Sequence, residues 1–219
     1  MSLRALVFDF DGLILDTEWS AFSTAASVWA EHGLELDLDV WQQIVGTAEH
    51  PHWSDMLETD LGRAIDREVV VAARQEQHHA EVEAMDLQPG VEALVRAAEV
   101  AGLALAVASS SPRYWVEGHL ERRGLAPSFR AVVCREDVER TKPDPALYRT
   151  ALDRLGVGPD EAVALEDSHH GTVAARAAGL PVVAVPNRVT AGQDFRPATL
   201  VVDSLEQVTL PALRELVGR

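Results

Sequence analysis

The sequence contains little cysteine, few basic residues and no long apolar run. Cys134 is the only cysteine among 219 residues, which excludes an intramolecular disulfide and is typical of a reducing compartment. Lys and Arg number 19 against 35 Asp and Glu, and the formal net charge of −16 argues against nucleic acid or an anionic membrane as the main partner. No apolar stretch reaches about 18 residues, and the N-terminus lacks a secretory signal pattern. We expect a cytoplasmic protein with no membrane partner.

The chain has two regions that differ in their hydrophobic pattern. Residues 16–87 predict helices only, near 17–32, 40–45, 53–61 and 67–85. Outside that block, short apolar runs predict buried strands at 5–8, 103–108, 131–134, 162–165, 182–185 and 200–202. Helices are predicted between them, at about 91–101, 114–123, 141–155, 168–178 and 205–217.

This alternation indicates an α/β protein with a Rossmann-like core, a parallel sheet with helices on both faces. The core would consist of residues 1–15 and 88–219. Residues 16–87 would form a small all-helical domain inserted after the first strand.

Two carboxylates follow the first strand. Asp9 and Asp11 are two residues apart, so they project to the same side while the backbone stays extended, and Gly12 allows a sharp turn after them. Two like charges this close are unfavourable unless a cation is shared or one group keeps its proton. The pair indicates a Mg²⁺ site, or a nucleophile beside a general acid/base. A solvated acidic turn is the alternative.

Other strands also end in polar residues. Ser109 and Ser110 follow the strand at 103–108, and Glu166 and Asp167 follow the strand at 162–165. Lys142 lies in a loop after another strand and before a helix. Because ligands bind beyond the carboxyl ends of parallel strands, we expect these side chains at one edge of the sheet.

Such a set has the parts that hydrolysis of a phosphomonoester requires. One carboxylate attacks phosphorus, and a neighbouring acid protonates the leaving alkoxide and then deprotonates water. Mg²⁺ bound by carboxylates offsets the charge between nucleophile and substrate. A hydroxyl, backbone N–H groups and a lysine stabilise the transferring group.

The motifs D-F-D-G at 9–12, Ser109, K-P-D-P at 142–145 and E-D-S at 166–168 resemble, in order and spacing, those of the haloacid dehalogenase-like hydrolase superfamily. The helical block resembles the cap domain of its phosphatase and β-phosphoglucomutase-like members. The acid at Asp11 is absent from the dehalogenases of this fold, so the resemblance implies phosphoryl transfer.

By this resemblance, Asp9 is the nucleophile and a metal ligand, and Asp11 is the general acid/base and binds the metal through its carbonyl. Ser109, Ser110 and Lys142 hold the phosphoryl group. Asp167, with Glu166 direct or through water, completes the Mg²⁺ site. Each of these could instead be structural: a strand end, a loop cap or a solvated turn.

The cap residues are less well marked. The resemblance implies substrate contacts from Gly46 of a cap loop and from Arg74. Arg113, just past the serine loop, is a further expected contact, and a surface position is the alternative for both arginines. The mutases carry a His shortly after the D-T dipeptide and a basic pair around the loop glycine, and both are missing here. The histidines are predicted to be surface or packing residues, with His170 the one that approaches the site. Among the four cap tryptophans, Trp19 and Trp53 are expected to face the cleft.

The sequence therefore predicts a monomeric Mg²⁺-dependent phosphatase that hydrolyses a small phosphorylated metabolite, such as a sugar phosphate, through an aspartyl-phosphate intermediate. Three alternatives stay open. One is a β-phosphoglucomutase-like phosphomutase, the second a phospho-accepting signalling module, and the third a binding protein that has lost its chemistry.

Overall fold

The structure, a computed structural model, describes residues 2–45 and 51–217. Its centre is a six-stranded parallel sheet in the order β3-β2-β1-β4-β5-β6. The strands are β1 (Ala5–Phe8), β2 (Ala104–Ala108), β3 (Ala131–Val133), β4 (Ala162–Glu166), β5 (Val182–Ala184) and β6 (Leu200–Val201). The first strand of the chain lies in the middle, between β2 and β4. The predicted α/β class with a parallel sheet is confirmed.

Two layers of helices cover the sheet because alternate strand residues face opposite sides. Leu6 and Phe8 pack with α5 (Val91–Val100), α6 (Arg113–Arg122) and α9 (Leu210–Leu216). Ala5 and Val7 pack with α7 (Ala146–Leu155) and α8 (His169–Ala177) on the other side. That second side is lined largely by alanine, at positions 104, 106, 108, 162 and 164, so bulkier helix side chains such as Tyr148 are accommodated against the sheet.

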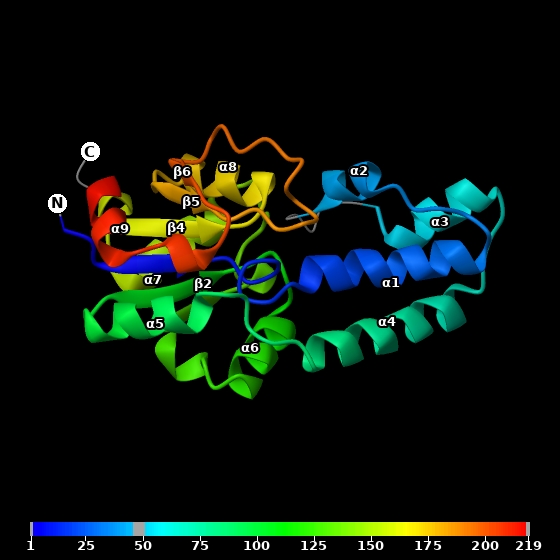
Figure 1. The fold of residues 1–219 in the computed structure, drawn as a ribbon, viewed down its shortest axis with the longest axis horizontal. Coiled ribbons are helices and arrows are strands. Elements are labelled where there is room, and N and C mark those ends of the chain that lie inside the picture. Colours follow the sequence, from blue (N-terminus) through cyan, green and yellow to red (C-terminus); the bar gives the residue numbers. More distant parts are fainter. Residues whose placement is uncertain (1, 46–50, 218–219) are drawn as a thin grey trace.

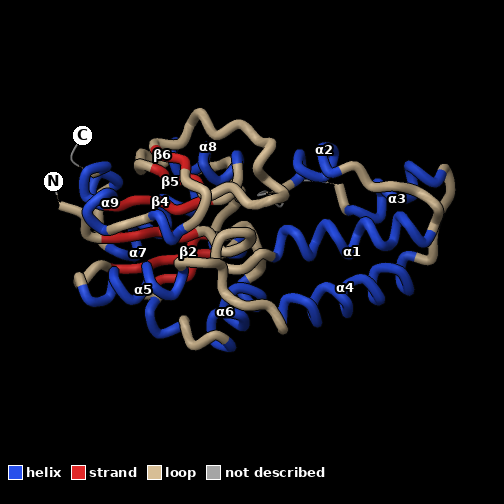
Figure 2. Tube along the Cα trace, viewed as in Figure 1, coloured by secondary structure: helices blue, strands red, loops and turns tan. Residues whose placement is uncertain are grey.

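Within the described residues, four α-helices between β1 and α5 form a separate group, called the helical group below. They are α1 (Thr17–Glu31), α2 (Leu38–Trp41), α3 (Trp53–Leu61) and α4 (Arg67–Glu83). Figures 1 and 2 show them beside the sheet, past the tips of its strands, while both chain ends lie at the opposite end. Trp29, Trp41 and Trp53 belong to an apolar cluster that is distinct from the two clusters on the faces of the sheet. The two connections to the sheet run close together, where the amide of Gln88 donates to the carbonyl of Ile14 at 2.9 Å.

Some predicted helices are shorter than the pattern indicated. The segment predicted at 40–45 is the end of α2 followed by a 3₁₀ turn, η1 (Gln42–Ile44). The predicted helix at 205–217 is divided into η5 (Leu205–Gln207) and α9, because the Thr209 side chain caps a new helix that has Pro near its start. Residues 141–145 form a turn, and α7 begins only at Ala146, since the prolines in this turn have no N–H for a helical hydrogen bond.

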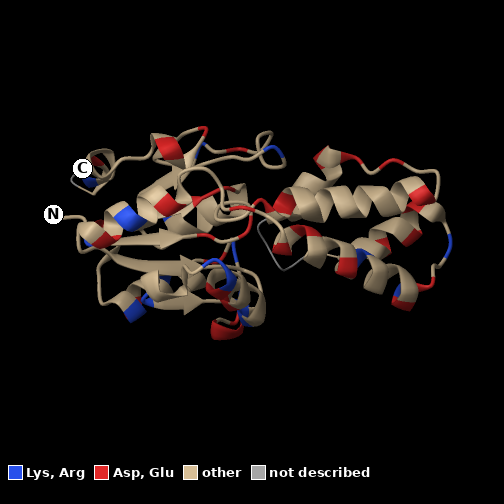
Figure 3. Cartoon of the chain, turned by 60° about the horizontal axis from the view of Figure 1, so that its bottom comes forward, with Lys and Arg blue, Asp and Glu red and all other residues tan. Residues whose placement is uncertain are grey.

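Short 3₁₀ turns complete the fold: η2 (Ala126–Ser128), η3 (Arg135–Asp137) and η4 (Pro159–Glu161). None of the helices in residues 2–45 and 51–217 has the length and apolar character that crossing a membrane requires. Figure 3 shows acidic residues on the loops where the sheet meets the helical group, as well as on the outer helices. The net negative charge of the chain therefore extends to the junction between its two parts.

Candidate active site

Three buried carboxylates meet at the carboxyl ends of β1 and β4. Asp9 follows β1, and its backbone N–H donates to the carbonyl of Leu165 at 2.9 Å, which joins the two strand ends. Asp9, Glu166 and Asp167 each offer an oxygen within 4.8 Å of the others, and their side chains are buried. The expectation that these acids share one edge of the sheet is met by the fold.

Lys142 lies between two of these acids. Its Nζ is 2.6 Å from Asp9 Oδ1 and 2.7 Å from Glu166 Oε1, and it is 1% exposed. It is also the only lysine in the chain; the rest of the 19 Lys and Arg residues are arginines. The hydroxyl of Tyr148, on α7, donates to Glu166. The Lys142 ammonium lies 5.4 Å from the centre of the Tyr148 ring. Burial raises the pKa of Tyr148 well above its usual value, so this phenol stays a donor.

The cluster has more negative charge than one lysine neutralises. Burial, reinforced by Glu166, raises the pKa of Asp9 to about 7, although Lys142 acts in the opposite direction. Burial, followed by Asp9 and Glu166, also raises the pKa of Asp167 well above its usual value. Burial lowers the pKa of Lys142, but Asp9 and Glu166 outweigh it and the net shift is upward.

These observations fit a divalent cation. Mg²⁺ prefers carboxylate oxygens as ligands. Bound between these buried carboxylates, it would neutralise the repulsion that contributes to the raised pKa values of Asp9 and Asp167. Two glycines allow the approach. Gly12 has φ +79°, and a Cβ there would lie 2.0 Å from Asp167 Oδ2. A Cβ at Gly171 would lie 2.0 Å from Glu166.

Asp11 stands apart from this cluster and is surrounded by donors. Its Oδ1 accepts from the Thr17 hydroxyl and from the Trp115 indole N–H, each at 2.9 Å. Its Oδ2 accepts from the Ser111 hydroxyl at 2.6 Å and lies 3.4 Å from that of Ser109. Two carboxylates two residues apart thus have opposite environments.

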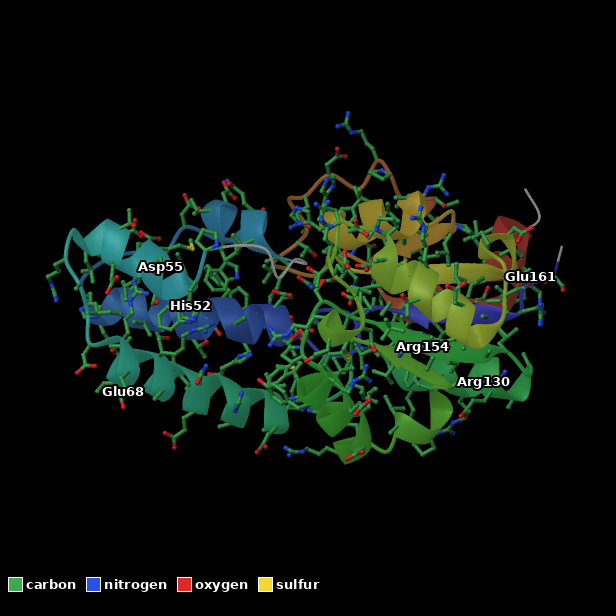
Figure 4. The ribbon with its side chains drawn as sticks, turned by 180° about the vertical axis from the view of Figure 1, so that it is seen from behind. His52, Asp55, Glu68, Arg130, Arg154 and Glu161 are labelled. Atoms are coloured by element: carbon green, nitrogen blue, oxygen red, sulfur yellow. The ribbon has the colours of Figure 1, made fainter. Side chains whose placement is uncertain are left out.

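A pocket of about 360 Å³ opens between Asp11 and the helical group. Its lining includes Glu18 from the start of α1, Trp53 from α3, and Arg74 and His78 from α4. Figure 4 labels His52, which also lines the pocket, at the beginning of α3. The pocket therefore has the Asp11 side of the site as its floor and the four helices as its roof.

Arg74 is a buried cation in this roof. It is 8% exposed, and its guanidinium lies 4.8 Å from the centre of the Trp53 ring and 5.9 Å from that of Trp41. One nitrogen donates to the carbonyl of Ala21 at 2.6 Å, but the Nε has no hydrogen-bond partner among the residues that the structure describes. Burial lowers the pKa of Arg74 to about 10, which leaves it charged at neutral pH.

Glu18 is a site residue that the sequence reasoning missed, because its place in a first helical turn already explained it. Its side chain is partly exposed to the pocket. Burial, followed by the charges of Asp11 and Asp9, raises its pKa to about 8. A carboxyl that holds its proton at neutral pH can donate a hydrogen bond to a substrate. The clue in the sequence was its position two residues past Asp16, in the first turn of the helix that follows the acidic loop.

Arg113 does not reach the pocket. Its guanidinium pairs with Glu117 at 2.7 Å and with Asp137, which also pairs with Arg154. Arg154 lies on α7, and Figure 4 shows it on the core, away from His52 and the helical group. The expectation of a substrate contact from Arg113 is at odds with this placement, because nearby acids on the core hold the side chain there.

The remaining predicted site residues have varied positions. Ser110 is half-buried in the loop after β2, beside the fully buried Ser109. Gly46 lies outside the described residues. His170 is 3.0 Å through its Nδ1 from the carbonyl of Val45, so it packs against the helical group.

Comparison with known proteins gives one consistent family. A family model described as "Haloacid dehalogenase-like hydrolase" matches residues 6–185. "Putative phosphatase YhcW" of Bacillus subtilis is 40% identical over 211 residues, covering 96% of both chains.

Solved structures agree over nearly the whole chain. A mutant of CbbY from Rhodobacter sphaeroides, in complex with xylulose-(1,5)bisphosphate, has a TM-score of 0.77 and 27% identity, covering 96% of this chain and 99% of that one. The "putative beta-phosphoglucomutase from Thermotoga maritima" has a TM-score of 0.78 and 27% identity, covering 98% of this chain and all of the other.

Proposed function

This chain belongs to the haloacid dehalogenase-like hydrolase family and is a phosphatase, and from that premise we propose how it works: Mg²⁺-dependent hydrolysis of a small phosphorylated metabolite through a phosphorylated Asp9. One observation carries the proposal. Asp9, Lys142 and Asp167 come from three distant parts of the chain, yet they form one buried group at the sheet edge, with Asp11 at the pocket beside it.

Asp9 acts as the nucleophile. A carboxylate oxygen of Asp9 attacks phosphorus, and the bond from phosphorus to the ester oxygen breaks. Lys142 fixes Asp9 through a 2.6 Å contact and balances part of the charge on the transferring group. Ser109 and Ser110, in the loop after β2, supply further donors to that group.

Asp11 moves the protons. It gives a proton to the departing alkoxide, and in the second half of the reaction it takes one from the attacking water. Water then adds to phosphorus, the acyl phosphate bond breaks, and phosphate leaves with Asp9 restored as a carboxylate. The positions of Asp9 and Asp11 support this division of roles, since Asp9 lies in the buried group with Lys142 and Asp167, whereas Asp11 lines the pocket in which the leaving group would lie.

The metal ligands in this proposal are Asp9, Asp167, the carbonyl of Asp11, and Glu166 directly or through water. Mg²⁺ bound there would offset the charge between the Asp9 carboxylate and the phosphoryl oxygens. Glu166 is the weakest of these ligands, because Lys142 and Tyr148 already engage its Oε1.

The same proposal assigns the two parts of the chain different tasks. Residues 1–15 and 88–219 form the catalytic core, and residues 16–87 form a cap that covers the pocket and excludes water during the first transfer. The pocket is lined by residues from both parts of the chain, which supports this division.

Release of inorganic phosphate tests the proposal. The purified protein with Mg²⁺ should release phosphate, with many turnovers per enzyme, from at least one member of a panel of phosphorylated sugars, nucleotides and organic acids. A single turnover that ends in a long-lived acyl phosphate would indicate a signalling module instead. No turnover of any panel member would contradict the proposal.

A phosphomutase is the second candidate, favoured by the similarity to a structure titled as a β-phosphoglucomutase. It would convert a sugar phosphate into an isomer faster than it releases phosphate. Product analysis by ³¹P NMR with a sugar 1-phosphate separates the two. We expect phosphate to accumulate and no isomer, because the chain lacks the basic pair of the mutase loop around Gly46.

Mg²⁺ should stabilise the folded protein in a pH-dependent way. The raised pKa values of Asp9 and Asp167 mean that the folded state holds these protons more tightly than the unfolded state. Without metal, the stability that they contribute is therefore present at low pH and is lost as the pH rises toward about 7 for Asp9. Mg²⁺ needs the ionised carboxylates, so its binding strengthens over the same interval.

We expect Mg²⁺ to raise the melting temperature clearly at pH 8 and much less at pH 5.5. In Asp167→Asn the shift at pH 8 should be largely lost, whereas Asp153→Asn, an exposed change on α7, should keep it. An equal Mg²⁺ shift in wild type and Asp167→Asn would remove Asp167 from the metal site.

Arg74 should select substrates with a second anionic group. Its Nε, which has no partner within residues 2–45 and 51–217, and its position in the pocket roof support a contact with a carboxylate or phosphate at the far end of the substrate. Arg74→Met should raise KM for such substrates by about 10- to 100-fold, which is the loss of affinity expected when one hydrogen bond to a charged group is removed. p-Nitrophenyl phosphate, which has no second anion, should show little change.

The matched control for Arg74→Met is Arg67→Met on the same helix. Arg67 is about half exposed and pairs with Asp55 at 2.6 Å, outside the pocket lining. It should leave KM unchanged for both classes of substrate. An equal KM increase for both classes in Arg74→Met would indicate that Arg74 only holds the helices together.

A further inference from the structure

Trp115 connects the helical group to the carboxylate of Asp11. It lies in the first turn of α6, just after the serine loop, and is the one tryptophan outside the helical group. Its indole N–H donates to Asp11 Oδ1 at 2.9 Å. The N–H of an indole is only a donor, so this contact is directed from the ring to the carboxylate.

Three histidines surround the same ring. His78 of α4 is stacked on it, with centroids 5.4 Å apart and an angle of 16° between the planes. His79, also of α4, is at 5.4 Å and 36°. His119 of α6 meets it edge-on at 4.3 Å. Figure 1 shows how this arises, since α4 ends beside α6 where the helical group returns to the core.

His78 is itself held in place. Its Nδ1 is 3.0 Å from the Ser20 hydroxyl, and that hydroxyl donates to Glu81 at 2.7 Å. Because the hydroxyl has one proton, Nδ1 of His78 must be the donor in their contact. Burial lowers the pKa of His78 to about 4, so the ring that stacks on Trp115 is neutral at pH 7.

We infer that Trp115 is a positioning residue for the proton transfers of Asp11. The indole N–H, together with Thr17 of α1, fixes Oδ1, while Ser111 fixes Oδ2. The inference rests on the proposed function, in which Asp11 is the general acid/base. It adds a residue outside the catalytic motifs, and it makes the orientation of Asp11 depend on α4, because α4 supplies two of the rings that hold the indole.

The effect should depend on the leaving group. A poor alkoxide leaving group needs the proton of Asp11 in the transition state, whereas p-nitrophenolate leaves without it. The quantity to compare is kcat/KM, since it reports the steps up to transfer of phosphate to the enzyme. A role confined to folding would lower kcat/KM equally for both kinds of substrate.

The experiment uses Trp115→Phe, which keeps an aromatic ring between the histidines and removes the donor. We expect kcat/KM for alkyl phosphates to fall about tenfold, and that for p-nitrophenyl phosphate to fall less than about twofold. The melting temperature is measured alongside. Glu121→Gln is the control, because it changes an exposed side chain on the same helix, outside the pocket lining, and should leave both values unchanged.

A second measurement covers the event that Trp115→Phe does not fold. In ¹H–¹⁵N spectra of the wild type, the indole signal of Trp115 should lie downfield, and Asp11→Ala should move it upfield while the other indole signals stay in place. An indole signal unaffected by Asp11→Ala, or equal losses for both substrates in Trp115→Phe, would overturn the inference. Absence of wild-type turnover on any phosphate ester would instead count against the proposed function.

Discussion

Asp9→Asn should fold normally and have less than about a hundredth of the wild-type phosphatase activity. The amide oxygen of Asn can still accept from Lys142, and Glu166 remains as the second partner of that ammonium. The substitution also removes one of the three crowded carboxylates, so the folded state should lose little stability. An amide is a poor nucleophile, however, and no acyl phosphate can form at this position.

The measurement is the release of phosphate from p-nitrophenyl phosphate and from the best natural ester, with saturating Mg²⁺. Asp153→Asn makes the same chemical change at an exposed site and should retain full activity. Asp11→Asn should differ from Asp9→Asn in one respect: its loss should be larger for alkyl esters than for the nitrophenyl ester. Activity of folded Asp9→Asn above about a hundredth of wild type would remove Asp9 from the role of nucleophile.

Lys142→Met should reduce both stability and activity. Methionine fills a similar volume but leaves Asp9, Glu166 and Asp167 buried together without a cation. Removing one partner of a buried ion pair typically costs about 3–5 kcal/mol of unfolding free energy. The transferring phosphoryl group also loses a positive charge, which should lower kcat by about 10²–10³.

A double variant separates these two effects. Lys142→Met/Glu166→Gln removes one of the uncompensated charges, so its unfolding free energy should recover part of the loss while its kcat stays low. Urea unfolding and steady-state kinetics on the single and double variants complete the cycle. Because Lys142 is the only lysine, selective ¹³C labelling of lysine gives one Cε signal, and we expect it to stay that of an ammonium through pH 9. A Lys142→Met variant with the unfolding free energy of wild type would contradict this description of the buried cluster.

The core of the fold was predictable because its signals are local. Short apolar runs followed by polar residues determine strands that are buried on both faces, and their alternation with helices leads to a parallel sheet. Placing Asp9, Lys142 and Asp167 at one edge then required only the rule that parallel strands end on the same side. The sequence has one further clue to this cluster, since only one of its 19 basic residues is a lysine and that lysine lies there.

The roof of the pocket was not predictable in the same way. Arg74 was expected there only from the family resemblance, because Arg74 and His78 lie on a helix whose pattern shows which side is apolar but does not show where that helix meets the core. Trp115 was overlooked because its partners, Asp11 and His78, are about a hundred and about forty residues earlier in the chain. Arg113 was expected at the substrate on the basis of its nearness to the serine loop, but Asp137 and Glu117 hold it over the core.

Trapping the phosphorylated enzyme tests the central claim most directly. Enzyme with Mg²⁺ is mixed with a ³²P-labelled ester, quenched in acid within one turnover, treated with hydroxylamine or left untreated, and digested for peptide mapping. We predict a hydroxylamine-sensitive label on the peptide that contains Asp9, formed and lost at rates that match turnover. An enzyme that turns over while carrying its label on another residue, or carrying none at any quench time, would contradict the account.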